Sequence, residues 1–253
     1  MQTCAIVTGH SRGLGAAIVQ QLTRRGIATL GLSRSAVGAP AGAAAGQFDE
    51  VALDLCDLDT LRDWLAGPQL ASWVIGRQRV LLVNNAGTLE PMGPLATQDP
   101  LAVADAVSLN VATPLMLSAA LAALDDTAQE RRIVHISSGA ARSAYAGWSV
   151  YCATKAALDQ HARAVALDAT PGLRICSLAP GVVDTSMQAA LRNVDATRFP
   201  LRERFEKLHR DGLLASPEDC AAGLVEYLLS DAFGSEPVAD LRQIQASARG
   251  VAT

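Results

Sequence analysis

The chain has 253 residues, of which 50% are hydrophobic and 18% are charged, so it can bury a sizeable core and is not a disordered chain. The formal net charge of −4, without any Lys/Arg block, indicates neither nucleic acid nor an anionic membrane as a partner. We see no apolar run that approaches the roughly 18 residues of a membrane span, and no signal-peptide pattern in the first residues, so we expect a cytoplasmic protein with no membrane partner.

The five cysteines are odd in number and widely spaced, and they form no CxxC pair or Cys/His cluster. This pattern predicts reduced thiols, a cytoplasmic location and no metal site. Cys152 stands beside Tyr151, where it could be a nucleophile. A small buried packing residue is the favoured interpretation, because free cysteines are among the most buried residues.

Short apolar or β-branched runs alternate with longer helical patterns along the chain. In chain order the patterns predict a strand at 4–8, a helix at 13–25, strands at 28–33 and 51–55, a helix at 59–75, a strand at 79–84, a helix at 100–124, a strand at 132–137, a helix at 149–169, a strand at 174–179, and mostly helix thereafter with a last strand near 238–243. This alternation predicts a single α/β domain, residues 1–253, with a doubly wound parallel sheet. Residues 35–47 are expected to be a loop within the domain.

A glycine-rich segment, TGHSRGLG (8–15), follows the first predicted strand and opens the first predicted helix. Ligands of such sheets bind at the carboxyl ends of the strands. Glycines let the backbone approach a pyrophosphate, and the helix N-terminus offers free N–H groups. Because the spacing of Gly9, Gly13 and Gly15 is not GxGxxG, a plain flexible turn is the alternative to a dinucleotide site.

The second predicted strand ends in Ser33, Arg34 and Ser35, where an NAD enzyme usually carries an acid for the ribose hydroxyls. A further guanidinium, Arg12, stands in the glycine turn. Arginine makes charge-assisted, often bidentate bonds to phosphate. The pair Arg12 and Arg34 therefore favours a 2′-phosphate, and hence NADP(H), over the alternative that one of them is merely solvated.

Seven motifs resemble those of the short-chain dehydrogenases/reductases in order and spacing, over about residues 4–190. They are TGHSRGLG (8–15), DL (54–55), NNAG (84–87), Asn110, Ser138, YCATK (151–155) and PGVVDT (180–185). Within that family, GWSVYCATKAALD and LAPGVVDTSMQ are most similar to the sepiapterin reductase and benzil reductase branch. The resemblance implies a Rossmann fold and hydride transfer between NADP(H) and a carbonyl compound.

The resemblance also implies four catalytic roles. Tyr151 would protonate the carbonyl oxygen, Lys155 would hold the nicotinamide ribose and lower the pKa of Tyr151, Ser138 would bind the carbonyl, and Asn110 would support a water between Lys155 and solvent. Tyr151 and Lys155 are i, i+4 and share a helix face. A shift of about three units from the usual tyrosine pKa of about 10 needs roughly 4 kcal/mol, which a nearby ammonium and a cationic nicotinamide could supply.

The predicted cofactor set joins the glycine turn and the second strand to the positions implied by the resemblance. It comprises Gly9, Ser11, Arg12, Gly13, Leu14, Gly15, Arg34, Ser35, Asp54, Leu55, Asn85, Gly87, Tyr151, Lys155, Gly181, Val183 and Thr185. The predicted substrate contacts are Ser138, Gly139, Tyr151 and Asp240. Asp240 corresponds in place to an aspartate that anchors the pterin ring in sepiapterin reductases, although a solvated acid is an equal alternative.

The resemblance further implies that a helical segment at about 184–212 covers the substrate. The C-terminal sequence departs from the tail that many relatives use to build tetramers. We therefore expect a homodimer through the helices at 100–124 and 149–169.

The function predicted from the sequence is NADPH-dependent reduction of a small ketone or vicinal dicarbonyl, benzil-like or sepiapterin-like, with Tyr151 as general acid. The alternatives are a 3-oxoacyl-carrier reductase or another short-chain alcohol dehydrogenase. An alternative of another class is a non-catalytic NADP(H)-sensing or scaffold protein, which would tolerate the loss of Tyr151, Lys155 or Ser138.

Overall fold

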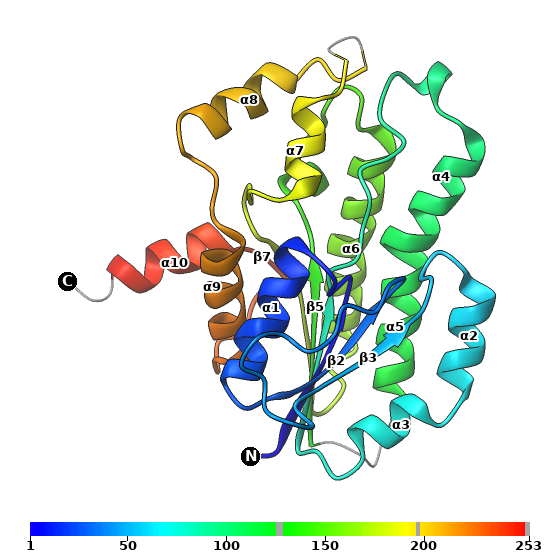
Figure 1. The fold of residues 1–253 in the computed structure, drawn as a ribbon, viewed down its shortest axis with the longest axis vertical. Coiled ribbons are helices and arrows are strands. Elements are labelled where there is room, and N and C mark those ends of the chain that lie inside the picture. The colour runs from blue at the N-terminus through cyan, green and yellow to red at the C-terminus, as the bar shows by residue number, and fades with distance from the viewer. Residues whose placement is uncertain (125–128, 196–197, 251–253) are drawn as a thin grey trace.

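A twisted parallel sheet lies at the centre of the computed structural model, which describes residues 1–124, 129–195 and 198–250 (Figure 1). Within these ranges the sheet has seven strands in the order β3-β2-β1-β4-β5-β6-β7. The strands are β1 (Thr3–Thr8), β2 (Ala28–Ser33), β3 (Phe48–Ala52), β4 (Arg79–Asn84), β5 (Glu130–Ile136), β6 (Leu173–Ala179) and β7 (Val238–Asp240). The strand order reverses at β1 and β4, so the predicted single-domain, doubly wound fold is confirmed.

Helices cover both faces of the sheet (Figure 1). Alternate residues of β1 point to opposite faces: Ala5 and Val7 join one apolar cluster, and Cys4 and Ile6 the other. The first face is covered by α1 (Gly13–Arg24) and α9 (Pro217–Leu229), and the second by α2 (Leu58–Ala66), α3 (Gln69–Val74), α5 (Thr113–Ala122) and α6 (Ser149–Leu167). Both faces are thus buried, which explains why the central strands read as continuous apolar runs.

The third strand begins and ends three residues earlier than predicted. β3 occupies Phe48–Ala52 instead of 51–55 and pairs with β2 in the register Leu32↔Val51. It is an edge strand, partly exposed, so its own residues lack the apolar run that marks the central strands. The buried residues Leu53 and Leu55 belong to the connection after the strand, and their apolar pattern shifted the predicted strand toward the C-terminus.

Two predicted helices are divided. The pattern at 59–75 forms α2 and α3, because Gly67 and Pro68 interrupt the backbone hydrogen bonding. The pattern at 100–124 forms α4 (Pro100–Val107), a π-helical turn at Ser108–Ala112, and α5.

The continuous helical stretch Pro100–Ala122 is long and apolar enough to cross a membrane by length and composition, contrary to the expectation from the sequence. One such helix is weak evidence for a span, since a helix of a soluble core passes the same test. It packs between α2 and α6 here, and it carries Asn110 into the interior.

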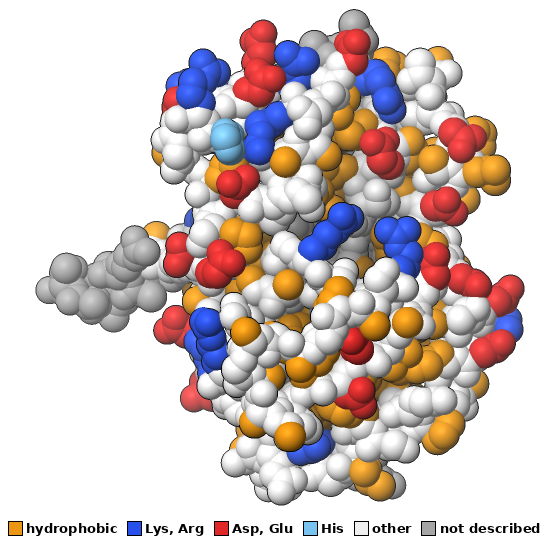
Figure 2. Space-filling model, viewed as in Figure 1, with side chains coloured by type: hydrophobic (Ala, Val, Ile, Leu, Met, Phe, Trp, Pro, Cys, Tyr) orange, Lys and Arg blue, Asp and Glu red, His pale blue; other side chains and the backbone are white. Residues whose placement is uncertain are grey.

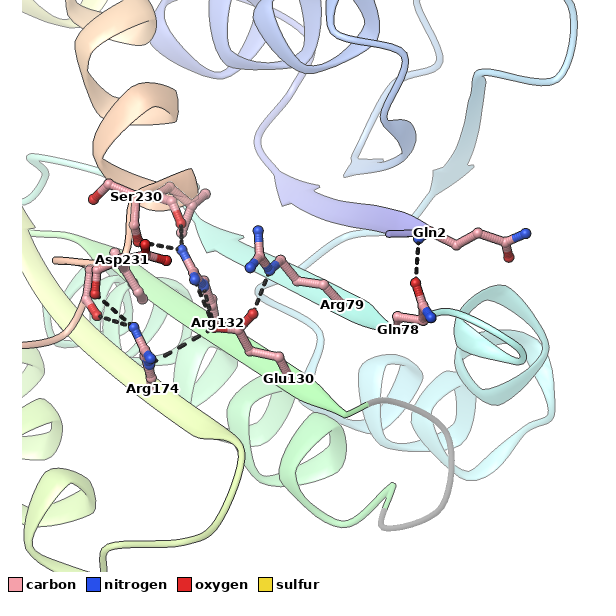
Figure 3. A network of polar contacts seen from close by, with 10 residues as sticks. Gln2, Gln78, Arg79, Glu130, Arg132, Arg174, Ser230 and Asp231 are labelled. Carbon is pink, nitrogen blue, oxygen red and sulfur yellow. Dashed lines mark hydrogen bonds and ion pairs between the residues drawn. The ribbon is translucent and has the colours of Figure 1, made fainter.

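A network of charged side chains ties the amino ends of β4, β5 and β6 together (Figure 3). Arg132 is 1% exposed, donates from Nε to Glu130 at 2.7 Å, and donates from Nη1 to the carbonyl oxygens of Leu228 and Ser230, each at 2.7 Å. Arg79 also pairs with Glu130. Each nitrogen of the buried guanidinium therefore has a polar partner, as burial of a charge requires.

At the opposite, carboxyl edge of the sheet lie α7 (Ser186–Arg192) and α8 (Arg202–Arg210) (Figure 1). Together they occupy most of the predicted covering segment 184–212, of which residues 196–197 lie outside the described residues. They rest on an aromatic cluster in which the Trp148 ring stacks on Phe199 at 4.8 Å between centroids and contacts Phe205 at 5.6 Å. The short α10 (Leu241–Gly250) follows β7.

Candidate active site

The glycine turn between β1 and α1 has a backbone that only glycine accommodates easily. Gly9 has a φ of +66°, and a Cβ there would lie 2.9 Å from Ala86 Cα. A Cβ on Gly15 would lie 2.1 Å from the carbonyl oxygen of Gly9. No side chain caps the first turn of α1, because Arg12 at the N-cap makes no capping bond. The free N–H groups and the open backbone fit the pyrophosphate of a dinucleotide.

A cleft of about 810 Å³ runs along the carboxyl edge of the sheet, beneath α7 and α8. Figure 2 shows this face of the molecule hollowed, with basic side chains at the hollow. All but two of the predicted site residues line the cleft: Gly9, Ser11, Arg12, Gly13, Leu14, Gly15, Arg34, Ser35, Asp54, Leu55, Asn85, Gly87, Ser138, Gly139, Tyr151, Lys155, Gly181, Val183 and Thr185. The two that are not among the lining residues are Asn110 and Asp240.

Tyr151 and Lys155 lie on one face of α6, opposite the end of β5. Lys155 Nζ donates to the carbonyl oxygen of Ile136 at 2.7 Å and lies 5.7 Å from the centroid of the Tyr151 ring. Ser138 begins the turn after β5 and contacts the Tyr151 hydroxyl through its side chain. The phenol, the ammonium and the hydroxyl therefore meet at one point of the cleft.

The two titratable groups respond to burial in opposite directions. Burial raises the pKa of Tyr151 to about 12, against a smaller lowering effect of the hydrogen bond with Ser138. Burial lowers the pKa of Lys155 to about 8, while the charge of Asp159 acts to raise it. The chain alone thus does not lower the tyrosine pKa as expected from the sequence. It keeps the phenol protonated near neutral pH, which is the state needed to donate a proton.

Asn110 reaches the site from the π-helical turn between α4 and α5. Its side chain is buried, its Nδ2 donates to Thr88 O at 2.9 Å and Thr154 Oγ1 at 3.2 Å, and its Oδ1 accepts from Thr88 N at 2.8 Å. A Cβ on Gly87 would lie 3.2 Å from Asn110 Oδ1 and 3.7 Å from Lys155 Nζ. Asn110 therefore holds the NNAG loop beside Lys155.

Asp159 was not predicted as a functional residue, yet it is 2% exposed and heavily hydrogen-bonded behind the site. Its carboxylate accepts from Ser137 Oγ at 2.7 Å, from Ser177 Oγ at 2.8 Å and from Arg142 Nε at 3.1 Å. It stands one helical turn after Lys155 and stabilises the charge of that lysine. The i, i+4 spacing on α6 was the signal in the sequence that could have identified it.

A second unpredicted group lies behind the Arg34 loop. Glu50 on β3 accepts from His10 Nε2 at 3.0 Å and from the backbone N–H groups of Val37 and Gly38 at 2.9 and 2.8 Å. His10 is buried and is not among the residues that line the cleft. The imidazole thus packs behind the glycine turn, and Glu50 ties that turn to the segment after Arg34.

Asp240 lies in a different arrangement from the one expected of a substrate anchor. Both carboxylate oxygens accept from the guanidinium of Arg242, from Nε at 2.9 Å and from Nη2 at 2.6 Å. The Asp240 side chain is 7% exposed and that of Arg242 is 66% exposed. Arg242, and not Asp240, is among the residues that line the cleft.

Comparison with known proteins places this geometry in a family. The sequence profile described as short chain dehydrogenase matches residues 3–196. The chain belongs to the short-chain dehydrogenase family.

Individual relatives agree with this membership over nearly the whole chain. Benzil reductase ((S)-benzoin forming) of Bacillus cereus is 31% identical over 236 residues, 90% of this chain and 94% of the relative. Sepiapterin reductase of Mus musculus is 34% identical over 255 residues, 92% of this chain and 94% of the relative. A solved short-chain dehydrogenase/reductase from Burkholderia vietnamiensis is 52% identical, with a TM-score of 0.69 over 95% of this chain and 97% of that chain.

Membership of the short-chain dehydrogenase family makes the chain an oxidoreductase that acts on CH–OH and C=O groups. The family uses a nicotinamide dinucleotide, NAD(H) or NADP(H). The open glycine turn and the uncapped N-terminus of α1 are the features of this chain that fit such a cofactor.

Proposed function

We propose that this short-chain dehydrogenase is an NADPH-dependent reductase of a small ketone or vicinal dicarbonyl, benzil-like or sepiapterin-like. The observation that carries the proposal is the convergence of a protonated Tyr151, Ser138 and Lys155 in a cleft whose other end presents Arg12 and Arg34. The identities with benzil reductase and sepiapterin reductase, at 31% and 34%, support the substrate class.

Arg12 and Arg34 support the choice of NADPH. Both line the cleft beside Ser35, and the described residues give neither guanidinium a carboxylate partner. A ribose 2′-phosphate would supply the missing anion and accept charge-assisted bonds from both. At the other end, Lys155 and the Asn110-bound loop would hold the nicotinamide ribose.

In this mechanism Tyr151 and Ser138 donate hydrogen bonds to the substrate carbonyl oxygen. A reduced nicotinamide held in the cleft would supply a hydride, with its electron pair, for the carbonyl carbon. As negative charge grows on the oxygen, Tyr151 transfers its phenolic proton there and an alcohol results. Lys155, next to the ring, stabilises the phenolate that remains until a proton returns from solvent. Residues of α7 and α8 exclude water from the reacting atoms.

The proposal is tested by following NADPH oxidation with benzil, sepiapterin and a 3-oxoacyl thioester. We expect turnover of a diketone or pterin ketone, and Tyr151→Phe should lower kcat by about 10²–10⁴-fold. Tyr227→Phe, in the core of the opposite face, is the matched control and should leave kcat unchanged. Preferential reduction of the thioester would support a 3-oxoacyl-carrier reductase. No turnover of any carbonyl, with NADPH still bound, would support a sensing protein.

We also propose a cytoplasmic homodimer that forms through α4, α5 and α6. Leu101 and Val107 on α4 are 75% and 44% exposed, and burying them in a partner would remove apolar surface from water. The five cysteines, all free and three of them buried, fit a reducing compartment. Light scattering of wild type and of a Leu101→Asp variant tests the interface; equal masses would contradict it.

A further inference from the structure

At the substrate end of the cleft lies the guanidinium of Arg242, whose orientation is fixed by its bonds to Asp240. Asp240 accepts from Nε and Nη2 of Arg242, and within the described residues the other N–H donors of that guanidinium make no hydrogen bond. The Arg242 side chain packs on Gly181, where a Cβ would lie 3.3 Å from Arg242 Cδ. Gly181 also has a φ of +88°, so both its backbone conformation and the close approach of Arg242 favour glycine at this position. A fixed guanidinium loses little conformational entropy when it binds an anion.

A second guanidinium and a hydroxyl lie next to this one. Arg204 on α8 lines the cleft, with Cζ 5.8 Å from the centroid of the Tyr145 ring. The Tyr145 hydroxyl is close enough to Arg242 to interact with its charge. Within the described part of the chain, this hydroxyl makes no hydrogen bond and Arg204 has no carboxylate partner. The Tyr145 side chain therefore lies near the guanidinium groups of Arg204 and Arg242, and its hydroxyl is available to donate a hydrogen bond.

These three side chains lie beside the reacting centre. A Cβ on Gly139, the residue after Ser138, would lie 3.8 Å from Tyr145 Oη. The acids that line the cleft are Asp54, Glu90 and Asp105. Of these, Asp54 and Asp105 lie near Cys56 at the proposed adenosine end, and Glu90 lies 3.8 Å from Arg198. The positive charge of Arg204 thus remains without a matching acid.

We propose that Arg204, Arg242 and Tyr145 form a subsite for a carboxylate carried by the ketone substrate. This inference rests on the proposed carbonyl reductase function and adds the charge of the substrate to it. A carboxylate accepts two parallel N–H bonds from a guanidinium and a third bond from a phenol. A pterin ring offers N–H donors instead, and the carboxylate of Asp240 that would receive them is already bound to Arg242.

The test compares three diketones that share the benzil scaffold, namely 4-carboxybenzil, its methyl ester and benzil, of which only the first carries a negative charge. For wild type with NADPH we expect kcat/KM to be at least tenfold higher for the carboxylate than for the ester. Arg204→Gln and Tyr145→Phe should each lower kcat/KM for the carboxylate at least tenfold more than for the ester, through KM. Tenfold is a loss of about 1.4 kcal/mol.

Arg242 is replaced together with its partner, as Arg242→Gln with Asp240→Asn, so that no buried carboxylate is left unpaired. This double variant should also lose the preference for the carboxylate. Arg210→Gln is the control, because it removes one positive charge from the same helix at a residue that does not line the cleft. It should leave all three substrates unchanged.

A binding measurement separates the subsite from the reaction. Calorimetric titration of 4-carboxybenzil and its ester into the NADP⁺-loaded protein reports affinity without turnover. Tighter binding of the carboxylate that is lost in Arg204→Gln, without reduction of any diketone, would keep the subsite and reject the proposed reaction. Reduction of all three substrates with equal kcat/KM, or equal losses for ester and carboxylate in every variant, would overturn the subsite.

Discussion

Asp159→Asn should change the pH dependence of catalysis more than its rate at the optimum. The carboxylate of Asp159 stabilises the charged form of Lys155, whose pKa burial has already lowered to about 8. Asparagine keeps the size of the side chain and an oxygen acceptor for the hydroxyls of Ser137 and Ser177. It removes the negative charge and leaves that of Arg142 in place. The pKa of Lys155 must therefore fall further.

The size of the shift follows from the helical spacing. Side chains at i and i+4 place their charges about 6–8 Å apart, and at an effective dielectric constant of about 20 the interaction is roughly 2–3 kcal/mol. That energy corresponds to a shift of about 1.5–2 pKa units. Activity needs the charged lysine beside the phenol, so kcat/KM falls as pH rises through the pKa of Lys155. In the variant this alkaline limb should move to about pH 6–6.5.

The assay is kcat/KM for a neutral diketone with saturating NADPH, measured between about pH 5 and pH 10. Asp168→Asn, which removes the same charge from the exposed C-terminal end of α6, is the control and should leave the profile unmoved. If the alkaline limb of Asp159→Asn coincided with that of wild type while the variant remained folded, Asp159 would have no electrostatic role toward Lys155.

Three further predictions follow from the cofactor end and the core. Arg34→Asp should lower kcat/KM for NADPH at least tenfold and spare NADH, as steady-state kinetics with both cofactors would show; an unchanged preference would remove Arg34 as the phosphate contact. Glu50→Gln should raise KM for NADPH several-fold with little effect on KM for the ketone, because the segment after Arg34 loses its anchor; equal changes in both would contradict this. Burial raises the pKa of Cys4 and Cys220 from 9.0 to about 12, so the stability they contribute is complete below pH 9 and is lost as pH rises toward 12. The lowered pKa of Lys155 has the opposite effect, because its contribution to stability rises between about pH 8 and pH 10.5. Thermal unfolding should therefore show Tm falling above pH 9, less steeply in Cys220→Ala, and a Tm independent of alkaline pH would refute the assignment.

The elements that the sequence predicted best are those whose signals are local. The strands at 28–33 and 79–84 match β2 and β4 residue for residue, because each is a buried apolar run that follows a glycine turn or a polar loop. β3 is an edge strand paired on one side only, and its neighbours Leu53 and Leu55 carry the apolar signal instead. Its position depended on register, which no local pattern encodes.

The site residues also divide into those that a local sequence pattern identifies and those that only the fold brings together. Tyr151 and Lys155 are recognisable from their spacing and from the motif around them. The bond between Glu50 and His10 joins residues 40 apart in the chain, and the pairing of β1 with β2 and of β2 with β3 brings them together. The substrate role of Asp240 was implied by the resemblance to sepiapterin reductases, and the sequence did not indicate that Arg242, two residues later, would bind both of its carboxylate oxygens.

The separation of the two edges of the sheet bears on how this enzyme could be altered. Arg132, Glu130 and Arg79 form a charged network at the amino edge, on the far side of the core from the cleft (Figures 1 and 3). The side chains of α7 and α8 that face the substrate take no part in that network. Substitutions such as Met187 or Leu208 to smaller or larger residues can therefore reshape the pocket while the strands stay clamped at their other ends. A chain built this way can acquire new substrates without surrendering its fold.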